Sequence, residues 1–67
     1  MLGKVTEVFI PNDDFNMIGF KIQIDDDVIE IVQKQSILNA NIYKDDLVNI
    51  RYDEKNEYVI ESFEDGK

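Results

Sequence analysis

The chain has 67 residues, 43% of them hydrophobic, with no cysteine or histidine and a formal net charge of −8. A chain of this length folds as one domain, residues 1–67, and without disulfides or zinc ligands it depends on buried apolar side chains for stability. The negative charge opposes binding to phosphate backbones and to anionic membranes, and it favours basic partners.

No long apolar stretch follows the first residues, so no signal peptide is expected. No segment approaches the roughly 18 to 20 consecutive apolar residues that a membrane-spanning helix needs. The lack of cysteine is compatible with a reducing compartment. We therefore expect a cytoplasmic protein.

The first predicted strand covers residues 3–10. Val5 and Val8 lie three residues apart in it, which breaks strict alternation. Either a β-bulge lies between them, or both faces of the strand are covered. Residues 11–14, PNDD, end the strand, because proline cannot donate to a ladder and Asn and Asp favour turns.

The clearest predicted strand covers residues 17–24. Lys21 and Gln23 fall on one face of it. The opposite face is apolar and is formed by Ile18, Phe20, Ile22 and Ile24. Three aspartates at 25–27 turn the chain, and residues 28–33 return as a third strand, so an antiparallel hairpin is expected.

The third strand is partly apolar on both faces, since Glu30 lies between two valines on the second face. Ile29 and Ile31 share one face, and Val28 and Val32 lie on the other. Such a strand is expected to be covered on its second face by another element or by a partner.

Residues 36–43 break the β pattern. Ser36 is a suitable helix cap, and Leu38 and Ile42 are four residues apart, so the segment predicts one or two helical turns. The segment is too short to be stable alone and is expected to plug the barrel. Strands are predicted after it at residues 47–52 and 57–63, with a polar turn between them.

This order predicts an all-β fold: a small five-stranded OB-like barrel with one short helical turn between the third and fourth strands. An SH3-like barrel is the alternative, but its helical turn usually precedes the last strand.

Three motifs carry a resemblance to a known family. They read GKVTEV at residues 3–8, GFKI at 19–22 and YKDDLVNI at 43–50. Together they resemble the RNA-binding OB repeat of the ribosomal-protein type, and residues 34–50 also resemble the transport-associated OB domain. The resemblance implies an OB-type barrel. Phe20 matches an aromatic position of the repeat, but its alternation with Ile18 and Ile22 equally favours burial, so no RNA-binding residue is carried over. Asp45 stands where the repeat has glycine, and the repeat's histidine has no counterpart.

Catalysis is not expected. Without histidine and cysteine the chain lacks the commonest general base and the strongest nucleophile. Ser36 is explained as a cap, and Ser62 lies mid-strand without a base near it in sequence. Asp13–Asp14 and Asp25–Asp27 with Glu30 offer oxygen ligands but lack EF-hand spacing, so neither a metal nor a cofactor is expected.

Two binding functions remain. The first choice is a non-enzymatic acidic module that binds another protein, such as a basic one, or a second copy of itself. Its candidate contacts are Val28, Val32, Val59 and Phe63, with Val59 and Phe63 expected opposite Tyr58 and Ile60.

The alternative is binding of single-stranded RNA or DNA, although the net charge opposes it. Its candidate contacts are Lys21, Gln23, Lys34, Tyr43 and Arg51. Mimicry of nucleic acid is less favoured, because the acids cluster in turns. The nucleic-acid hypothesis requires Lys21, Lys34 and Arg51 to converge on one concave face without carboxylates.

Overall fold

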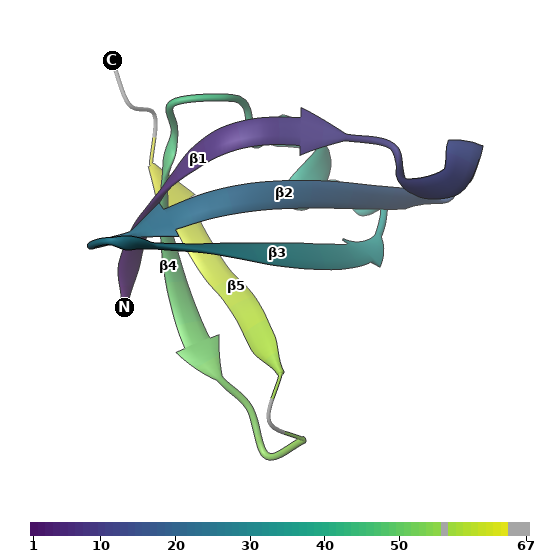
Figure 1. The fold of residues 1–67 in the computed structure, drawn as a ribbon. Coiled ribbons are helices and arrows are strands. Elements are labelled where there is room, and N and C mark those ends of the chain that lie inside the picture. Colours follow the sequence, from purple (N-terminus) through teal and green to yellow (C-terminus); the bar gives the residue numbers. More distant parts are fainter. Residues whose placement is uncertain (56, 65–67) are drawn as a thin grey trace.

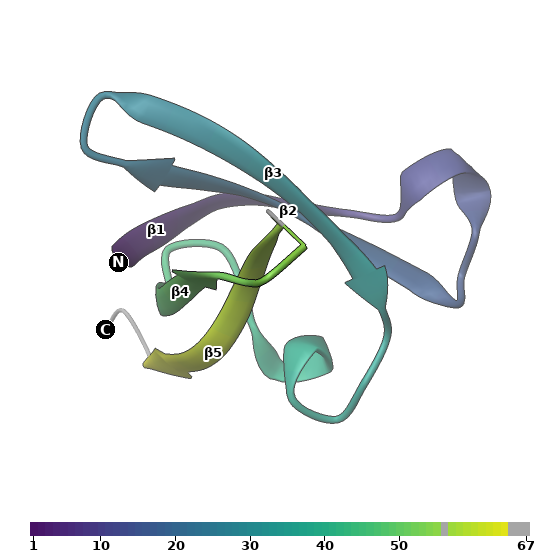
Figure 2. The same ribbon diagram turned by 90° about the horizontal axis from the view of Figure 1, so that it is seen from below.

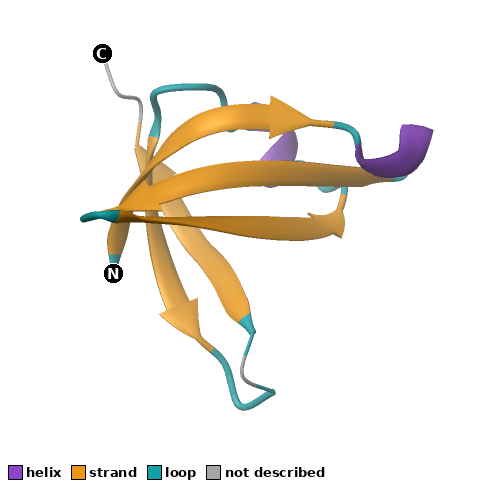
Figure 3. Ribbon diagram, viewed as in Figure 1, coloured by secondary structure: helices purple, strands orange, loops and turns teal. Residues whose placement is uncertain are grey.

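The computed structural model of the chain describes residues 1–55 and 57–64 as strands joined by turns and two short 3-10 helices (Figures 1 and 3). The elements are β1 (Leu2–Phe9), η1 (Pro11–Asp13), β2 (Met17–Ile24), β3 (Asp27–Lys34), η2 (Asn39–Asn41), β4 (Leu47–Tyr52) and β5 (Tyr58–Glu64). The five predicted strands are confirmed, β2 and β4 with the predicted bounds and the others within one residue at each end. The helical turn between the third and fourth strands is confirmed as η2.

All strand pairs are antiparallel, in the order β3-β2-β1-β4-β5. The central strand β1 pairs with β2 along most of its length but with β4 only through residues 2–4. Figures 1 and 2 show β4 and β5 leaving the β1–β2–β3 layer at a steep angle. Within the described residues no ladder joins β3 to β5, so the sheet is open. The predicted closed barrel is therefore not formed, because its two edge strands diverge.

The core fills the angle between the two layers. Every strand contributes to it, and so does the segment after η2. Its fully or nearly buried hydrophobic members are Val5, Ile18, Phe20, Ile22, Ile31, Ile42, Val48, Ile50 and Ile60. Each large side chain buried in this way contributes about 1.5–3 kcal/mol. The inward face predicted for residues 18–24 is thus confirmed, with Ile24 packed at its margin.

Two β-bulges change the face of the sheet toward which the following side chains point. In β1 the register with β2 shifts between Val5 and Glu7, which confirms a bulge at Thr6, whose Oγ1 donates to the Lys21 carbonyl at 3.1 Å. In β5 the register with β4 passes from Ser62 to Ile60, leaving Glu61 as the extra residue. Because one inserted residue reverses the alternation, a strict period of two does not hold along β5.

The turn into β4 is fixed by backbone and carboxylate contacts. Val5 N donates to the Asp46 carbonyl at 2.9 Å, and Asp45 N donates to the Val5 carbonyl at 2.8 Å. Asp46, which is 7% exposed, accepts a bond from Tyr43 N at its Oδ2, 2.8 Å away. Asp45 takes a positive φ of 76°, a conformation that favours glycine.

The connection from β3 to β4 is organised by Asn39, which is 4% exposed. Asn39 N donates to Ser36 Oγ at 3.1 Å, and Ser36 N donates to Asn39 Oδ1 at 2.8 Å. Ser36 thus stabilises the turn that leads into η2, but the N-cap residue of η2 is Leu38, which makes no side-chain cap bond. Ile42 enters the core, whereas Leu38, four residues earlier, is 46% exposed. No helix in the described part of the chain is long and apolar enough to cross a membrane.

Candidate protein-interaction surface

The outer face of β3 carries a row of side chains that point away from the core. The β3 outer row consists of Val28, Glu30, Val32 and Lys34. Val28 is 60% exposed and Val32 is 45% exposed. Across the ladder the row faces Gln23, Lys21, Gly19 and Met17 of β2, in that order. Two valines on one exposed face are therefore separated by a single carboxylate.

The neighbouring charges form a row across three strands. Lys21 lies opposite Glu30 of β3 and opposite Glu7 of β1. Its Nζ is 3.9 Å from Glu7 Oε2, and both side chains are about half exposed. Lys21 thus lies between two carboxylates, which reduce the attraction it offers to a phosphate.

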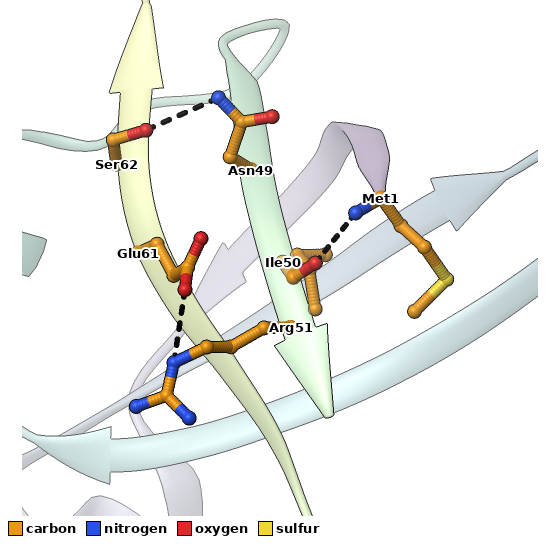
Figure 4. Close-up of polar contacts among 6 residues, drawn as sticks. All are labelled: Met1, Asn49, Ile50, Arg51, Glu61 and Ser62. Carbon is orange, nitrogen blue, oxygen red and sulfur yellow. Dashed lines mark hydrogen bonds and ion pairs between the residues drawn. The ribbon is translucent and has the colours of Figure 1, made fainter. Parts of the chain in front are cut away.

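The nucleic-acid candidates do not form one basic face. Lys21, Gln23 and Lys34 share the outer face of β2 and β3. Arg51 lies on β4, in the other layer, with its Nε 3.0 Å from Glu61 Oε1 (Figure 4). Tyr43 is exposed in the turn before β4. The bases are therefore interspersed with acids and spread over two layers.

The other two protein-contact candidates, Val59 and Phe63, lie in different surroundings. Phe63 lies opposite Val48 and packs, partly buried, against the core, whereas Val59 lies opposite Arg51. The bulge at Glu61 causes this separation, so the expectation that Val59 and Phe63 share a face is wrong. Of the four candidates, only Val28 and Val32 lie together on an exposed surface.

Polar side chains of β4 and β5 make contacts between the two strands (Figure 4). Asn49 Nδ2 donates to Ser62 Oγ at 3.1 Å, beside the Arg51–Glu61 ion pair. Met1 extends the β1–β4 ladder, since its N donates to the Ile50 carbonyl and Ile50 N donates to the Met1 carbonyl, each at 2.7 Å. Met1 and Leu2 are also exposed here, at 55% and 58%, and Leu2 lies opposite Asn49.

The two most exposed of the large apolar side chains in the described residues were not among the contacts predicted from the sequence. Ile37 is 88% exposed and Phe15 is 76% exposed, each in a connection between strands. The signal for both is an apolar residue within a polar connecting segment.

In the described residues, no group of three or more acidic, histidine or cysteine side chains is placed to hold a metal ion.

Comparisons of the chain with protein families, with curated proteins and with solved structures found no match. The functional argument therefore depends on the chain's own residues.

Proposed function

We propose that the chain is a non-enzymatic acidic module that binds a basic partner protein through the β3 outer row. The observation that carries this proposal is the exposure of Val28 and Val32, at 60% and 45%, on one face of one strand. Apolar side chains held in register on a sheet supply the buried area of an interface without reordering the backbone.

The charge distribution supports a basic partner. The chain has 15 acids against 7 bases. Three bases lie beside a carboxylate: Lys4 at 3.7 Å from Asp45, Lys21 at 3.9 Å from Glu7 and Arg51 at 3.0 Å from Glu61. A nucleic acid would have to displace these acids to reach the bases, whereas a basic surface meets unneutralised carboxylates.

For the fold we propose an open form of an OB-like barrel. The support is the position of η2 between β3 and β4 and the pairing of β1 with both β2 and β4. The sheet edges, β3 and β5, are the strands that would have to meet for closure. The SH3-like alternative is less favoured because the helical turn does not precede the last strand.

Affinity capture with the full chain as bait tests the function. The samples are the unaltered chain, a Val28→Ser/Val32→Ser variant and a matched Phe15→Ser/Ile37→Ser variant, each with and without nuclease. We expect a basic partner that survives nuclease, is lost with the first variant and is kept with the second. Circular dichroism establishes that both variants retain the sheet.

Loss of every partner on nuclease treatment would overturn this proposal in favour of the single-stranded nucleic-acid alternative. A partner that binds the Val28→Ser/Val32→Ser variant as well as the unaltered chain would also overturn it, since the β3 outer row would then not be the contact.

A further inference from the structure

The edge of β3 that faces away from β2 is unpaired among the described residues. It extends over the eight residues Asp27–Lys34. β3 pairs with β2 in continuous register over all eight positions, without a bulge. The sheet therefore ends in one long and regular strand.

The register shows which backbone groups point outward. Ile24 and Asp27 flank the two-residue turn Asp25–Asp26, and residues in that position form a hydrogen-bonded pair. Hydrogen-bonded pairs alternate along an antiparallel ladder, so residues 27, 29, 31 and 33 direct their N–H and C=O groups toward β2. Val28, Glu30, Val32 and Lys34 direct theirs to the open edge.

Two contacts at the end of β3 agree with this alternation. Asn39 Nδ2, which comes from outside the sheet, donates to the Lys34 carbonyl at 2.7 Å. Gln35 N, one residue further, points the other way and donates to the Asn16 carbonyl at 2.9 Å. The open edge thus consists of the N–H and C=O groups of Val28, Glu30 and Val32, together with the N–H of Lys34.

This edge lacks the devices that usually prevent strand addition, such as proline, a bulge or a short strand. Lys34 is its only base, and it lies at the end. The opposite edge of the sheet, β5, differs: it carries the bulge at Glu61, and Glu61 and Glu64 are exposed. Strand addition is therefore favoured at β3 and disfavoured at β5.

A second copy of the chain suits this edge less well than a basic segment does. If the β3 strands of two copies pair antiparallel about a two-fold axis at Glu30, the Glu30 carboxylates of the two copies lie opposite each other and repel. The register centred on Val32 requires the Lys34 carbonyl, which already accepts a bond from Asn39. Each copy also brings a charge of −8. A segment carrying Lys or Arg instead meets Glu30 and the aspartates at the turn.

We propose that β3 binds its partner by strand addition: an extended segment, with Lys or Arg alternating with apolar residues, pairs with the backbone of Val28, Glu30 and Val32. The inference rests on the proposed function and specifies how the basic partner binds. Main-chain hydrogen bonds supply the affinity, and the side chains of the β3 outer row supply the selectivity.

Amide hydrogen exchange and methyl NMR of the full chain test this proposal. The probes are a lysine–valine alternating peptide as long as β3, the same peptide with glutamate for lysine, and the lysine peptide N-methylated at alternate residues. We expect fast exchange at Val28, Glu30 and Val32 in the unbound chain, and at least tenfold slower exchange with saturating lysine peptide. The other two peptides should produce no such slowing.

Two pairs of variants sharpen the test. Glu30→Gln is expected to weaken binding of the lysine peptide by about twofold to fivefold, and Glu54→Gln, an equal charge change in the β4–β5 turn, by less. Val32→Pro removes one outward N–H but no donor to β2, and is expected to abolish binding. Val32→Thr, which keeps the N–H, should retain it. If Val32→Pro does not fold, the exchange rates of the edge amides in the unaltered chain, with and without the lysine peptide, still test the proposal.

Each of three results would overturn this proposal, either the pairing with the β3 edge or the requirement for a basic segment. If the valine methyls shift while the edge amides stay unprotected, the partner binds on the outer face and the proposed function stands without this mode. If the glutamate peptide protects the edge equally, charge plays no part. If the edge amides are already protected and sedimentation gives a dimer, a second copy occupies the edge.

Discussion

The ring of Phe9 lies against Gly19, its partner across the β1–β2 ladder. A Cβ at residue 19 would overlap the ring atoms Cε1, Cε2 and Cζ. Gly19 is buried beneath this ring although it belongs to the outer face of β2. Two positions of the ladder are therefore energetically coupled.

Gly19→Ala is expected to destabilise the chain by about 1–2 kcal/mol, because the Phe9 ring must move toward solvent. In a Phe9→Ala background the same change is expected to stabilise by about 0.5–1 kcal/mol, since Ala is favoured over Gly in a strand. Urea unfolding of the four chains measures the coupling as a double-mutant cycle. Equal effects of Gly19→Ala in both backgrounds would contradict the ring contact.

Gly3→Ala is expected to cost about 1–3 kcal/mol. Its Cβ would lie 2.5 Å from Ile22 Cγ2, 3.0 Å from Ile24 Cγ1 and 3.2 Å from the Gln23 carbonyl oxygen. Ile22 is fully buried and the carbonyl is backbone, so neither can give way as the Phe9 ring can. The free energy of unfolding from urea titration checks this, and a cost below that of Gly19→Ala would count against the packing at Gly3.

Asp45→Gly is expected to be more stable than Asp45→Ala by about 1 kcal/mol. Both changes remove the exposed ion pair with Lys4, but only glycine relieves the positive φ of 76°. Thermal unfolding of the two variants side by side measures the effect of the backbone conformation on stability, since the carboxylate is absent from both. Equal midpoints would show that this backbone conformation is not retained in solution.

Asn39→Ala is expected to cost about 2–3 kcal/mol, because it removes the acceptor for Ser36 N and the donor to the Lys34 carbonyl. Ser36→Ala removes one hydrogen-bond acceptor and is expected to cost about 1 kcal/mol. Chemical denaturation of both variants gives the comparison. The order of the two costs is the test, and a larger loss for Ser36→Ala would refute the central role of Asn39.

The unfolding midpoint is expected to rise as salt increases from about 0.01 to 0.15 M, because screening weakens the repulsion within a chain of net charge −8. Sodium chloride and choline chloride should act alike at equal ionic strength. A midpoint that falls instead would mean that exposed pairs such as Arg51–Glu61 outweigh the repulsion.

Strand positions followed from the sequence because apolar alternation and turn residues are local signals. Residues 17–24 alternate strictly, and Asp25 and Asp26 mark the turn, so that hairpin was predictable. The break between Val5 and Val8 likewise indicated the bulge that the structure has at Thr6.

The relations between strands did not follow from local pattern. The bulge at Glu61 follows three consecutive apolar residues, 58–60, where no alternation marks the inner face, so the faces of Val59 and Phe63 were misassigned. Closure of the sheet depends on the angle between two layers, which no single segment encodes. The positive φ of Asp45 was not indicated either, because that backbone conformation favours glycine and the residue is an aspartate.

The central place of β1 has a consequence for biosynthesis. Residues 2–9 are synthesised before the other four strands, and their hairpin with β2 can form as soon as residues 17–24 follow. The contact of Gly3 with Val48 closes a loop of more than forty residues and forms later. Until then the edge of β1 that faces β4 in the complete sheet is unpaired. A nascent chain whose synthesis stops before Leu47 would thus expose the unpaired edges of β1 and β3, whereas the complete sheet exposes the edges of β3 and β5.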